Sequence, residues 1–246
     1  MLHLQICKIS PHTNSRASME YRIFVNKQVR KNALIIRSSI WLELHVFSAL
    51  DASPLPWRPH SKSPGCHRET HFLWKLRVLY LSSNILFSLL PRGLRNCTQL
   101  QYLDPSQNNL HGPIPLEVGQ LTNLWDLSLY SNFLTGATPP SSFALPLLED
   151  IYLNQNNLIG EISSNIGNLT ALFNLWLEEN KLSETIPASI KNCHRLSNLY
   201  LHHNQLNGKL PASLGRLQSL AHLYLASNMF AGAIPKQVAM SRDSLI

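Results

Sequence analysis

Two pairs of side chains with titratable groups, Glu178–Glu179 and His202–His203, are separated by an interval that recurs along this chain. Histidine beside a carboxylate can titrate near neutral pH, and both residue types are metal ligands. The pairs meet only if the chain returns to the same place after each such interval. Two interpretations stay open, a titratable or metal-binding centre and a solvated polar patch. The second needs fewer assumptions, so no metal and no cofactor are predicted.

Aromatic side chains share the same spacing, at Tyr152, Trp176, Tyr200 and Tyr224. Tyr and Trp combine a large contact area with a polar group, so exposed on a rigid surface they are favoured anchors for a partner. The alternative is that these rings are common strand residues that stack on one another. Asp126 and Asp150, separated by the same interval, are candidates for receiving a basic side chain of a peptide.

A ladder of asparagines at that constant interval identifies the elements that must position these groups. Apolar residues precede each of these Asn residues by eight, five and, with one exception, three positions, and another follows two positions later. A fixed period of about 20–29 residues with the core L-x-x-L-x-L-x-x-N-x-L is typical of leucine-rich repeats, in which each repeat is one turn of a solenoid. The ladder consists of Asn84, Asn108, Asn132, Asn156, Asn180, Asn204 and Asn228.

Alternation within each repeat predicts a short strand with leucines on its inner face. In the sixth repeat Leu199 and Leu201 flank Tyr200, and successive side chains of a strand point to opposite faces. Parallel strands from stacked turns lie about 4.8 Å apart, so outward residues form columns across the turns. The two Glu–His pairs and the aromatic residues fall in such columns. The Asn amide is interpreted as structural, since it satisfies backbone groups where the strand ends.

The second half of each repeat carries a more specific motif. The segments LHGPIPLEVGQL from Leu110, LIGEISSNIGNL from Leu158 and LNGKLPASLGRL from Leu206 share L-x-G-x-I-P-x-x-(L/I/V)-G-x-L in most positions. This resembles the plant-type leucine-rich repeat family of receptor kinases, receptor-like proteins and polygalacturonase inhibitors, from Leu76 to about Asp243. The resemblance implies an α/β solenoid, a right-handed superhelical horseshoe with parallel strands and ligand contact on its concave face. The motif glycines permit a positive φ at the bend: Gly112, Gly136, Gly160, Gly208 and Gly232.

The predicted organisation is an irregular basic flank with a degenerate cap over residues 1–75 and a leucine-rich repeat domain of seven turns over residues 76–246. The flank has 11 Lys and Arg against 4 Asp and Glu, so it carries the whole formal charge of +7. No nucleic-acid motif accompanies that charge, and no nucleic-acid partner is predicted. The apolar run 33–50 is interrupted by charged residues, which argues against a membrane span. We expect it to dock on the first turn.

The cysteines and one proline carry structural expectations. Cys97 and Cys193 occupy a repeat position where other turns have leucine, and four turns separate them, so each is expected to be a buried free thiol. Cys7 and Cys66 could pair, although nothing in the flank requires it. Pro105 replaces an inward strand leucine of turn two and removes a hydrogen-bond donor from the ladder.

Asn96-Cys97-Thr98 and Asn168-Leu169-Thr170 are N-glycosylation sequons. In a secreted chain these sequons would be glycosylated. The alternative is that such sequences are common in the family and carry no glycan here. The resemblance implies an extracellular or plasma-membrane location, while the lack of a clean signal peptide leaves a cytoplasmic one open.

No phosphate loop, kinase lysine or nucleophile elbow occurs in the chain, so it is not expected to be an enzyme. The predicted function is a protein- or peptide-binding module that resembles a fragment of a plant receptor ectodomain, in signalling or defence, with a co-receptor as a further partner. The alternatives are a secreted polygalacturonase-inhibitor-like protein and a truncated paralogue without activity. The predicted binding residues are the aromatic residues at turns four to seven, the two Glu–His pairs, Asp126 and Asp150.

Overall fold

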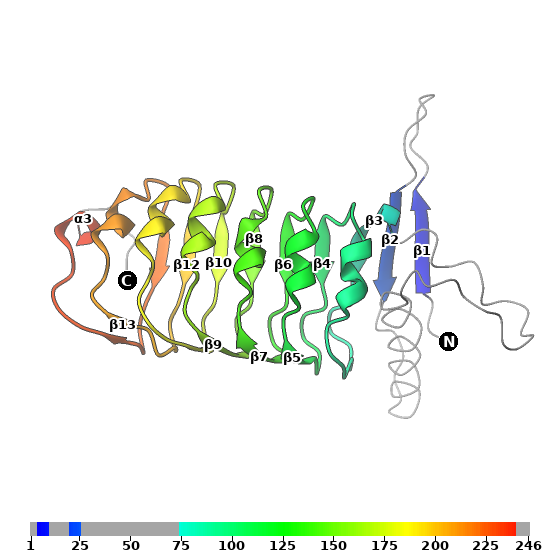
Figure 1. Ribbon diagram of the computed structural model, residues 1–246, viewed down its shortest axis with the longest axis horizontal. Helices are drawn as coiled ribbons and strands as arrows, with labels where there is room; N and C mark the ends of the chain where they lie inside the picture. The colour runs from blue at the N-terminus through cyan, green and yellow to red at the C-terminus, as the bar shows by residue number, and fades with distance from the viewer. Residues whose placement is uncertain (1–3, 10–19, 26–73, 240–246) are drawn as a thin grey trace, which may run out of the picture.

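Parallel strands recur once per repeat in the computed structural model, which describes residues 4–9, 20–25 and 74–239 (Figure 1). Each strand pairs with the strand of the next turn at equivalent positions, as Leu175 does with Leu199. The seven strands are β3 (Leu76–Tyr80), β4 (Tyr102–Asp104), β6 (Asp126–Ser128), β8 (Asp150–Tyr152), β10 (Asn174–Trp176), β12 (Asn198–Tyr200) and β14 (His222–Tyr224). This confirms the predicted repeat register and the solenoid.

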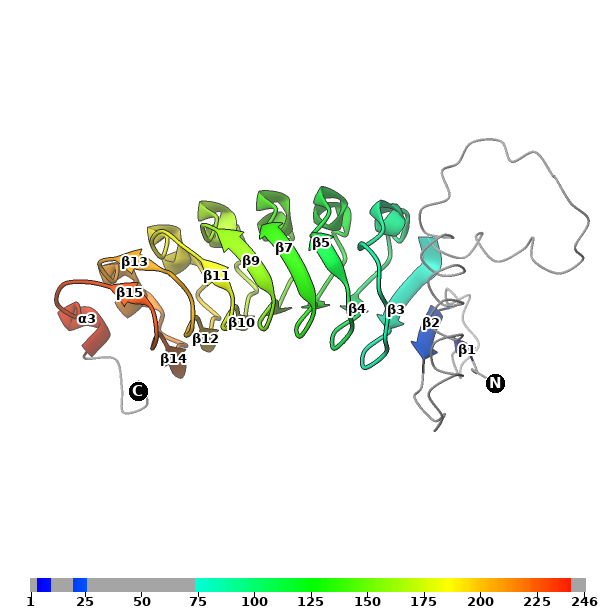
Figure 2. The same cartoon turned by 90° about the horizontal axis from the view of Figure 1, so that it is seen from below.

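Short helices line the outer side of the arc that Figure 2 shows, opposite the strands. They are the 3-10 helices η3 (Arg92–Asn96), η4 (Leu116–Gln120), η5 (Pro140–Ala144), η6 (Ser164–Asn168), η7 (Ala188–Asn192) and η8 (Ala212–Arg216). Five of these six follow an N-cap proline in extended conformation, and η6 follows Ser163. Each turn of the solenoid leaves room for little more than one helical turn, and short runs are where 3-10 geometry is common. The last helix is α3 (Lys236–Ala239).

The flank contributes two strands to the same sheet. Strands β1 (Leu4–Ile9) and β2 (Glu20–Val25) are antiparallel to each other, and β2 runs parallel to β3. The expectation of an irregular flank is therefore wrong for these two segments, which place a hairpin on the strand edge of turn one. Residues 33–50 and Cys66 lie outside the described residues.

A second set of strands runs along one side of the solenoid, beyond the Asn ladder. One sheet contains β5 (His111–Pro113), β7 (Phe133–Ala137), β9 (Asn157–Gly160) and β11 (Lys181–Leu182), and a separate pair contains β13 (Asn207–Gly208) and β15 (Met229–Phe230). All these pairs are parallel. Strand pairs therefore join turns two to five, and turns six and seven, on a second side as well.

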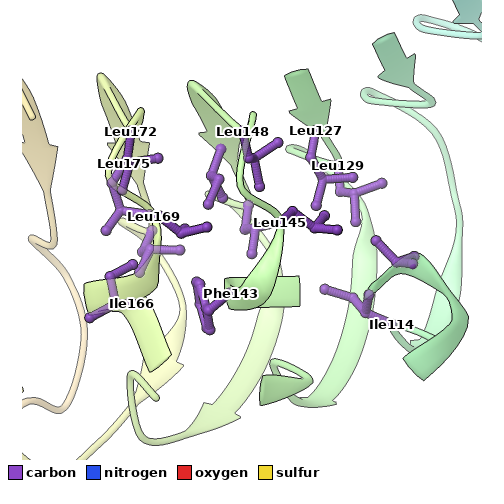
Figure 3. Packing of buried hydrophobic residues seen from close by; sticks show 14 of the residues in the cluster. Ile114, Leu127, Leu129, Phe143, Leu145, Leu148, Ile166, Leu169, Leu172 and Leu175 are labelled. Carbon is purple, nitrogen blue, oxygen red and sulfur yellow. The ribbon is translucent and has the colours of Figure 1, made fainter. Parts of the chain in front are cut away.

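Leucine and isoleucine columns fill the interior between the strands and the helices (Figure 3). Leu199 and Leu201 of turn six have no exposed surface, and burying one such side chain contributes about 1.5–3 kcal/mol. In turn three, Ser142 takes the position of Val118 in turn two and is buried, and the following residue, Phe143, is buried as well. Phe143 adds a large apolar side chain to the core of this turn.

Both cysteines of the repeats behave as predicted. Cys97 and Cys193 are buried free thiols with no exposed surface. Burial raises the pKa of each thiol to about 12, so neither is a reactive thiolate at neutral pH. Cys193 Sγ lies 3.2 Å from the carbonyl oxygen of Ile166, one turn earlier.

The Asn ladder links consecutive turns. Nδ2 of Asn180 donates to the carbonyl of Leu177 in its own turn, at 3.1 Å, and to that of Leu153 in the preceding turn, at 3.0 Å. Its Oδ1 accepts from the backbone N–H of Leu158 in the preceding turn, at 3.0 Å. The same set recurs from Asn108 to Asn228. The structural interpretation of the ladder is correct, and the bonds between turns extend it.

Two bends in each of turns two to seven have left-handed backbone conformation. The five motif glycines have φ between 72° and 86°, as predicted, and Glu184 takes the glycine position in turn five with φ 66°. The residue directly before each ladder Asn also has positive φ, including Glu179 at 55° and His203 at 54°. The strands therefore end earlier than the sequence pattern indicated.

Pro105 interrupts the ladder of hydrogen bonds between turns. In turns three to six the equivalent leucine donates its backbone N–H to the next strand, as Leu129 does to Tyr152 at 2.8 Å. Proline has no N–H, so this bond is missing in turn two. Strands β4 and β6 accordingly pair over two positions, whereas β8 and β10 pair over three. Pro105 itself is buried, which confirms its inward position.

Candidate functional site

Tyr152, Trp176, Tyr200 and Tyr224 form a continuous row of rings on the concave face, here called the aromatic row. Trp176 and Tyr200 stack with centroids 4.9 Å apart and planes at 14°. Tyr152 meets Trp176 edge-on at 5.0 Å, and Tyr224 meets Tyr200 edge-on at 4.7 Å. Tyr224 is 39% exposed, and the other three rings are half-buried.

Ring stacking, the alternative interpretation of these residues, is thus realised in the structure. It does not remove the row from the surface, because each ring keeps an accessible part. Stacking restricts the rotamers of the rings, and a rigid aromatic surface loses little conformational entropy when a partner binds. The row is a preorganised platform that crosses four consecutive turns.

Asp104, Asp126 and Asp150 lie on turns two, three and four and form an acidic row. Asp126 and Asp150 pair directly in the β6–β8 register. Burial raises the pKa of Asp126 to about 6; a hydrogen bond from Ser128 opposes the shift, and the charges of Asp150 and Asp104 add to it. Burial also raises the pKa of Asp150, against a hydrogen bond from Asn174. These two predicted site residues are brought together as expected.

Hydrogen bonds connect the acidic row to the aromatic row. Asn174 Nδ2 lies 2.7 Å from Asp150 Oδ1 and 3.1 Å from the hydroxyl of Tyr152. Asn198 donates in turn to Asn174 Oδ1 at 2.5 Å. Burial, with the charge of Asp150, raises the pKa of Tyr152 to about 12. The tyrosine hydroxyl is therefore a neutral group at physiological pH.

The Glu–His patch differs from its prediction. Glu178 follows the end of β10 and is buried, with 7% of its surface exposed, and Glu179 lies in the left-handed bend. Glu179 accepts from Gln155 Nε2 of the preceding turn at 3.4 Å. In residues 74–239 no ion pair joins either glutamate to His202 or His203; Arg195 and Glu149 form one at 3.2 Å. Glu178 is therefore buried and His202 half-buried, whereas Glu179 and His203 are exposed, as the interpretation as a solvated polar patch expects.

His202 packs among rings rather than against a carboxylate. Its ring centroid lies 5.9 Å from that of Tyr224, 6.3 Å from that of Tyr200 and 5.3 Å from that of His203. Burial lowers the pKa of His202, the charge of His203 adds to this effect, and Glu179 opposes it. His202 is therefore neutral at physiological pH.

Buried polar atoms without a hydrogen-bond partner gather beside the aromatic row. They are Oδ1 of Asn154, Nε1 of Trp176, Oε2 of Glu178 and Nδ1 of His202, from three consecutive turns. Burial raises the pKa of Glu178 to about 7, opposed by a hydrogen bond with its own backbone and assisted by Glu179. Asn154 was not among the predicted site residues. The sequence feature that could have identified Asn154 is its position, which is the same in its repeat as the positions of Glu178 and His202 in the next two repeats.

Residues 74–239 contain no group of three or more His, Cys, Asp or Glu placed to hold a metal ion. Within the described segments, no helix is long and apolar enough to cross a membrane. Asn168 is an exposed residue at the end of η6, and Asn96 is half-buried at the end of η3.

Comparison with known proteins agrees with this architecture. A family profile described as Leucine Rich Repeat matches residues 75–97 and 195–217. The LRR ectodomain of the plant membrane receptor kinase GASSHO1/SCHENGEN3 from Arabidopsis thaliana, solved with CASPARIAN STRIP INTEGRITY FACTOR 2, is similar to the chain. It is 36% identical over 70% of this chain and 20% of its own length, with a TM-score of 0.67. The chain is built of leucine-rich repeats that are similar to those of plant receptor kinase ectodomains.

Two further receptors resemble these leucine-rich repeats. The Arabidopsis receptor kinase HAESA, in complex with the peptide hormone IDA and the co-receptor SERK1, is 32% identical over 67% of this chain and 28% of its own, with a TM-score of 0.66. PEPR1, solved with AtPEP1, is 33% identical over 82% of this chain and 32% of its own, with a TM-score of 0.65. The chain thus spans about a third or less of each receptor structure. No curated protein sequence matches it.

Proposed function

We propose that this chain is a peptide- or protein-binding module from the ectodomain of a plant receptor-like kinase or receptor-like protein, acting in signalling or defence. The observation that carries the proposal is the aromatic row, a rigid and accessible platform beside polar atoms that lack partners. Similar receptor ectodomains have been solved with bound peptides, which supports a ligand of this class. The module binds rather than catalyses, and a kinase domain would belong to another part of the parent protein.

The proposed ligand lies across turns four to seven of the concave face. The aromatic row supplies the anchors, and Glu178, Glu179, His202 and His203 supply polar contacts at its edge. A co-receptor would join the complex as it does for HAESA. In this role the chain is extracellular, at the plasma membrane, and glycosylated at Asn168 and Asn96.

A random peptide library displayed on phage tests the proposal when it is selected against the purified full chain. Selected peptides should lose affinity about thirtyfold on Trp176→Ala, because truncating a central aromatic anchor typically costs about 2 kcal/mol. Tyr224→Ala, at the exposed end of the row, should weaken binding with less effect on ring packing. The control is Lys191→Ala on the convex helix η7. Peptides that bind all three variants as tightly as the parent would refute the proposed face.

A further inference from the structure

The concave face has an uneven distribution of charge. Four columns of residues cross it, those six, four, two and one positions before each ladder Asn. They contain five carboxylates and neither lysine nor arginine, although the whole chain has 21 Lys and Arg against 14 Asp and Glu. The carboxylates are Asp104, Asp126, Asp150, Glu178 and Glu179.

Among the described residues, no lysine or arginine forms an ion pair with any of these five carboxylates, since the ion pair found there joins Arg195 and Glu149. Oδ1 of Asp126 accepts from the Ser128 hydroxyl at 2.7 Å, and Oδ1 of Asp150 accepts from the Asn174 amide at 2.7 Å. Both donors are neutral. Asp126 and Asp150 occupy paired positions of adjacent strands, where like charges repel. A cation placed between the two carboxylates would remove that repulsion.

A second and independent observation lies on the other side of the aromatic row. Glu178 and Asn154 are more than nine-tenths buried, with 7% and 8% of their surface exposed, and each has a side-chain oxygen without any hydrogen-bond partner. A buried polar atom without a hydrogen-bond partner destabilises the fold, and more so when it is charged. Both atoms are acceptors, so the group that would satisfy them is a donor. Because they are covered, a ligand reaches them only after neighbouring side chains change rotamer.

Cation recognition would also use the rings between these two acidic sites. Arginine stacks on aromatic faces and presents five N–H donors in a planar fork. Trp176 Nε1 is an unpartnered donor, and a peptide carbonyl oxygen would satisfy it. The carboxylates, the aromatic faces and the Trp176 Nε1 donor together complement an arginine-containing peptide better than an acidic or a purely apolar peptide.

We propose that the ligand of the concave face is a basic peptide segment whose arginine side chains reach the Asp126–Asp150 pair and Glu178, on either side of the aromatic row. This inference rests on the proposed function and specifies the chemistry of its ligand. The basic ligand contacts turns three to six, so the site begins one turn earlier than the aromatic row.

Three synthetic peptides of identical length and backbone, titrated calorimetrically into the full chain, test the inference. Each has a Gly/Ser/Tyr framework with two variable positions one residue apart, filled by arginine, by citrulline or by glutamate. Citrulline keeps the shape of arginine without its charge. The arginine peptide should bind about tenfold or more tightly than the citrulline peptide, because losing one member of a desolvated charge pair is that costly. The glutamate peptide should show no binding.

Matched variants locate the effect on the protein. Glu178→Gln and Asp150→Asn each keep side-chain shape, and each should weaken the arginine peptide several-fold while changing the citrulline peptide little. Glu161→Gln is the control, since Glu161 is an exposed carboxylate of turn four outside the four columns. Equal loss on Glu161→Gln would mean non-specific attraction and would overturn the inference. Failure of the arginine peptide to bind would also overturn it.

The two proposals fail in different ways. Library peptides that depend on Trp176 but contain no arginine would leave the binding face intact and refute only its basic ligand. Library peptides that bind the Trp176→Ala variant as tightly as the parent would refute the proposal that the concave face is the binding site.

Discussion

Asn156→Ala is expected to lower the free energy of unfolding by about 3 kcal/mol. The Asn156 amide makes four hydrogen bonds in a buried position. Its Oδ1 accepts from the N–H of Leu134 at 3.0 Å. Its Nδ2 donates, at 3.0–3.2 Å, to the carbonyls of Leu129, Leu153 and Asn154.

The magnitude follows from what each lost bond leaves behind. All three carbonyls keep another donor, namely Asn132 Nδ2, Asn180 Nδ2 and the N–H of Ser131. Losing the three hydrogen bonds from Asn156 Nδ2 should therefore cost only about 0.5 kcal/mol each. The backbone N–H of Leu134 loses its acceptor, Asn156 Oδ1. A buried donor without a partner costs about 1–3 kcal/mol.

Asn84→Ala provides the matched comparison within the same ladder. Asn84 donates to the carbonyls of Leu81 and Ser82 but belongs to the first turn, so no preceding repeat supplies an N–H to its Oδ1. Its replacement should cost about 1 kcal/mol. Urea unfolding of both variants, followed by far-UV circular dichroism, measures the difference. Equal losses would refute the claim that bonds between turns provide most of the ladder's contribution.

Three further variants test separate parts of the structure. Pro105→Leu should raise the free energy of unfolding by about 1–3 kcal/mol, because it restores a ladder hydrogen bond and a larger buried side chain; an unchanged urea midpoint would mean that turn two accommodates the proline. Glu178 has a folded-state pKa of about 7, raised from 4.5, so its protonated form favours folding and this contribution is lost as pH rises from about 4.5 through 7. Glu178→Gln should therefore stabilise the chain at pH 8 by about 1 kcal/mol, after allowance for solvent screening, and little at pH 4; equal effects at both values would contradict the shift. Secretion from plant cells should add a glycan to Asn168, seen as a mass shift that peptide N-glycosidase and Asn168→Gln both abolish, and a chain secreted without that shift would contradict the proposed modification.

A basic ligand should bind more tightly as pH rises, because two of the carboxyl groups proposed to contact it have raised pKa values. Asp126 and Glu178 have pKa values of about 6 and 7, so both lose protons between pH 5 and 8 and then attract a guanidinium group. The charged groups that act on Asp126 are Asp150 and Asp104, and the one that acts on Glu178 is Glu179. The titratable side chains of His202 and His203 lie on the next turn. Calorimetric titration of the arginine peptide at pH 5 and pH 8 should give the tighter complex at pH 8. Identical affinities would show that these carboxylates do not contact the ligand.

The repeat register was predictable from the sequence because it depends on local spacing. One ladder Asn in every repeat places Leu175 opposite Leu199 regardless of how the rest of the chain folds. The same spacing correctly placed the aromatic row, the Asp126–Asp150 pair and the buried cysteines. Periodicity is sufficient wherever each turn repeats the geometry of its neighbour.

The remaining features depend on where the periodic pattern stops. Burial of Glu178 could not be read from its column, because β10 ends at Trp176 and the left-handed residue that follows Glu178 turns the chain inward. The β1–β2 hairpin lies outside the repeats, and its pairing with β3 depends on contacts distant in sequence. The 3-10 geometry of the outer segments depends on the space that each turn leaves, which residue types alone do not show.

A crystal structure of the full chain with an arginine-containing peptide from the library would test the central claim most directly. The account predicts an extended peptide across the concave face, in contact with Trp176 and Tyr200, and with a guanidinium group within about 3 Å of a carboxylate oxygen of Asp150 or Glu178. A peptide bound to the outer helices η3–η8, or to the sheet of β5, β7, β9 and β11, would contradict it.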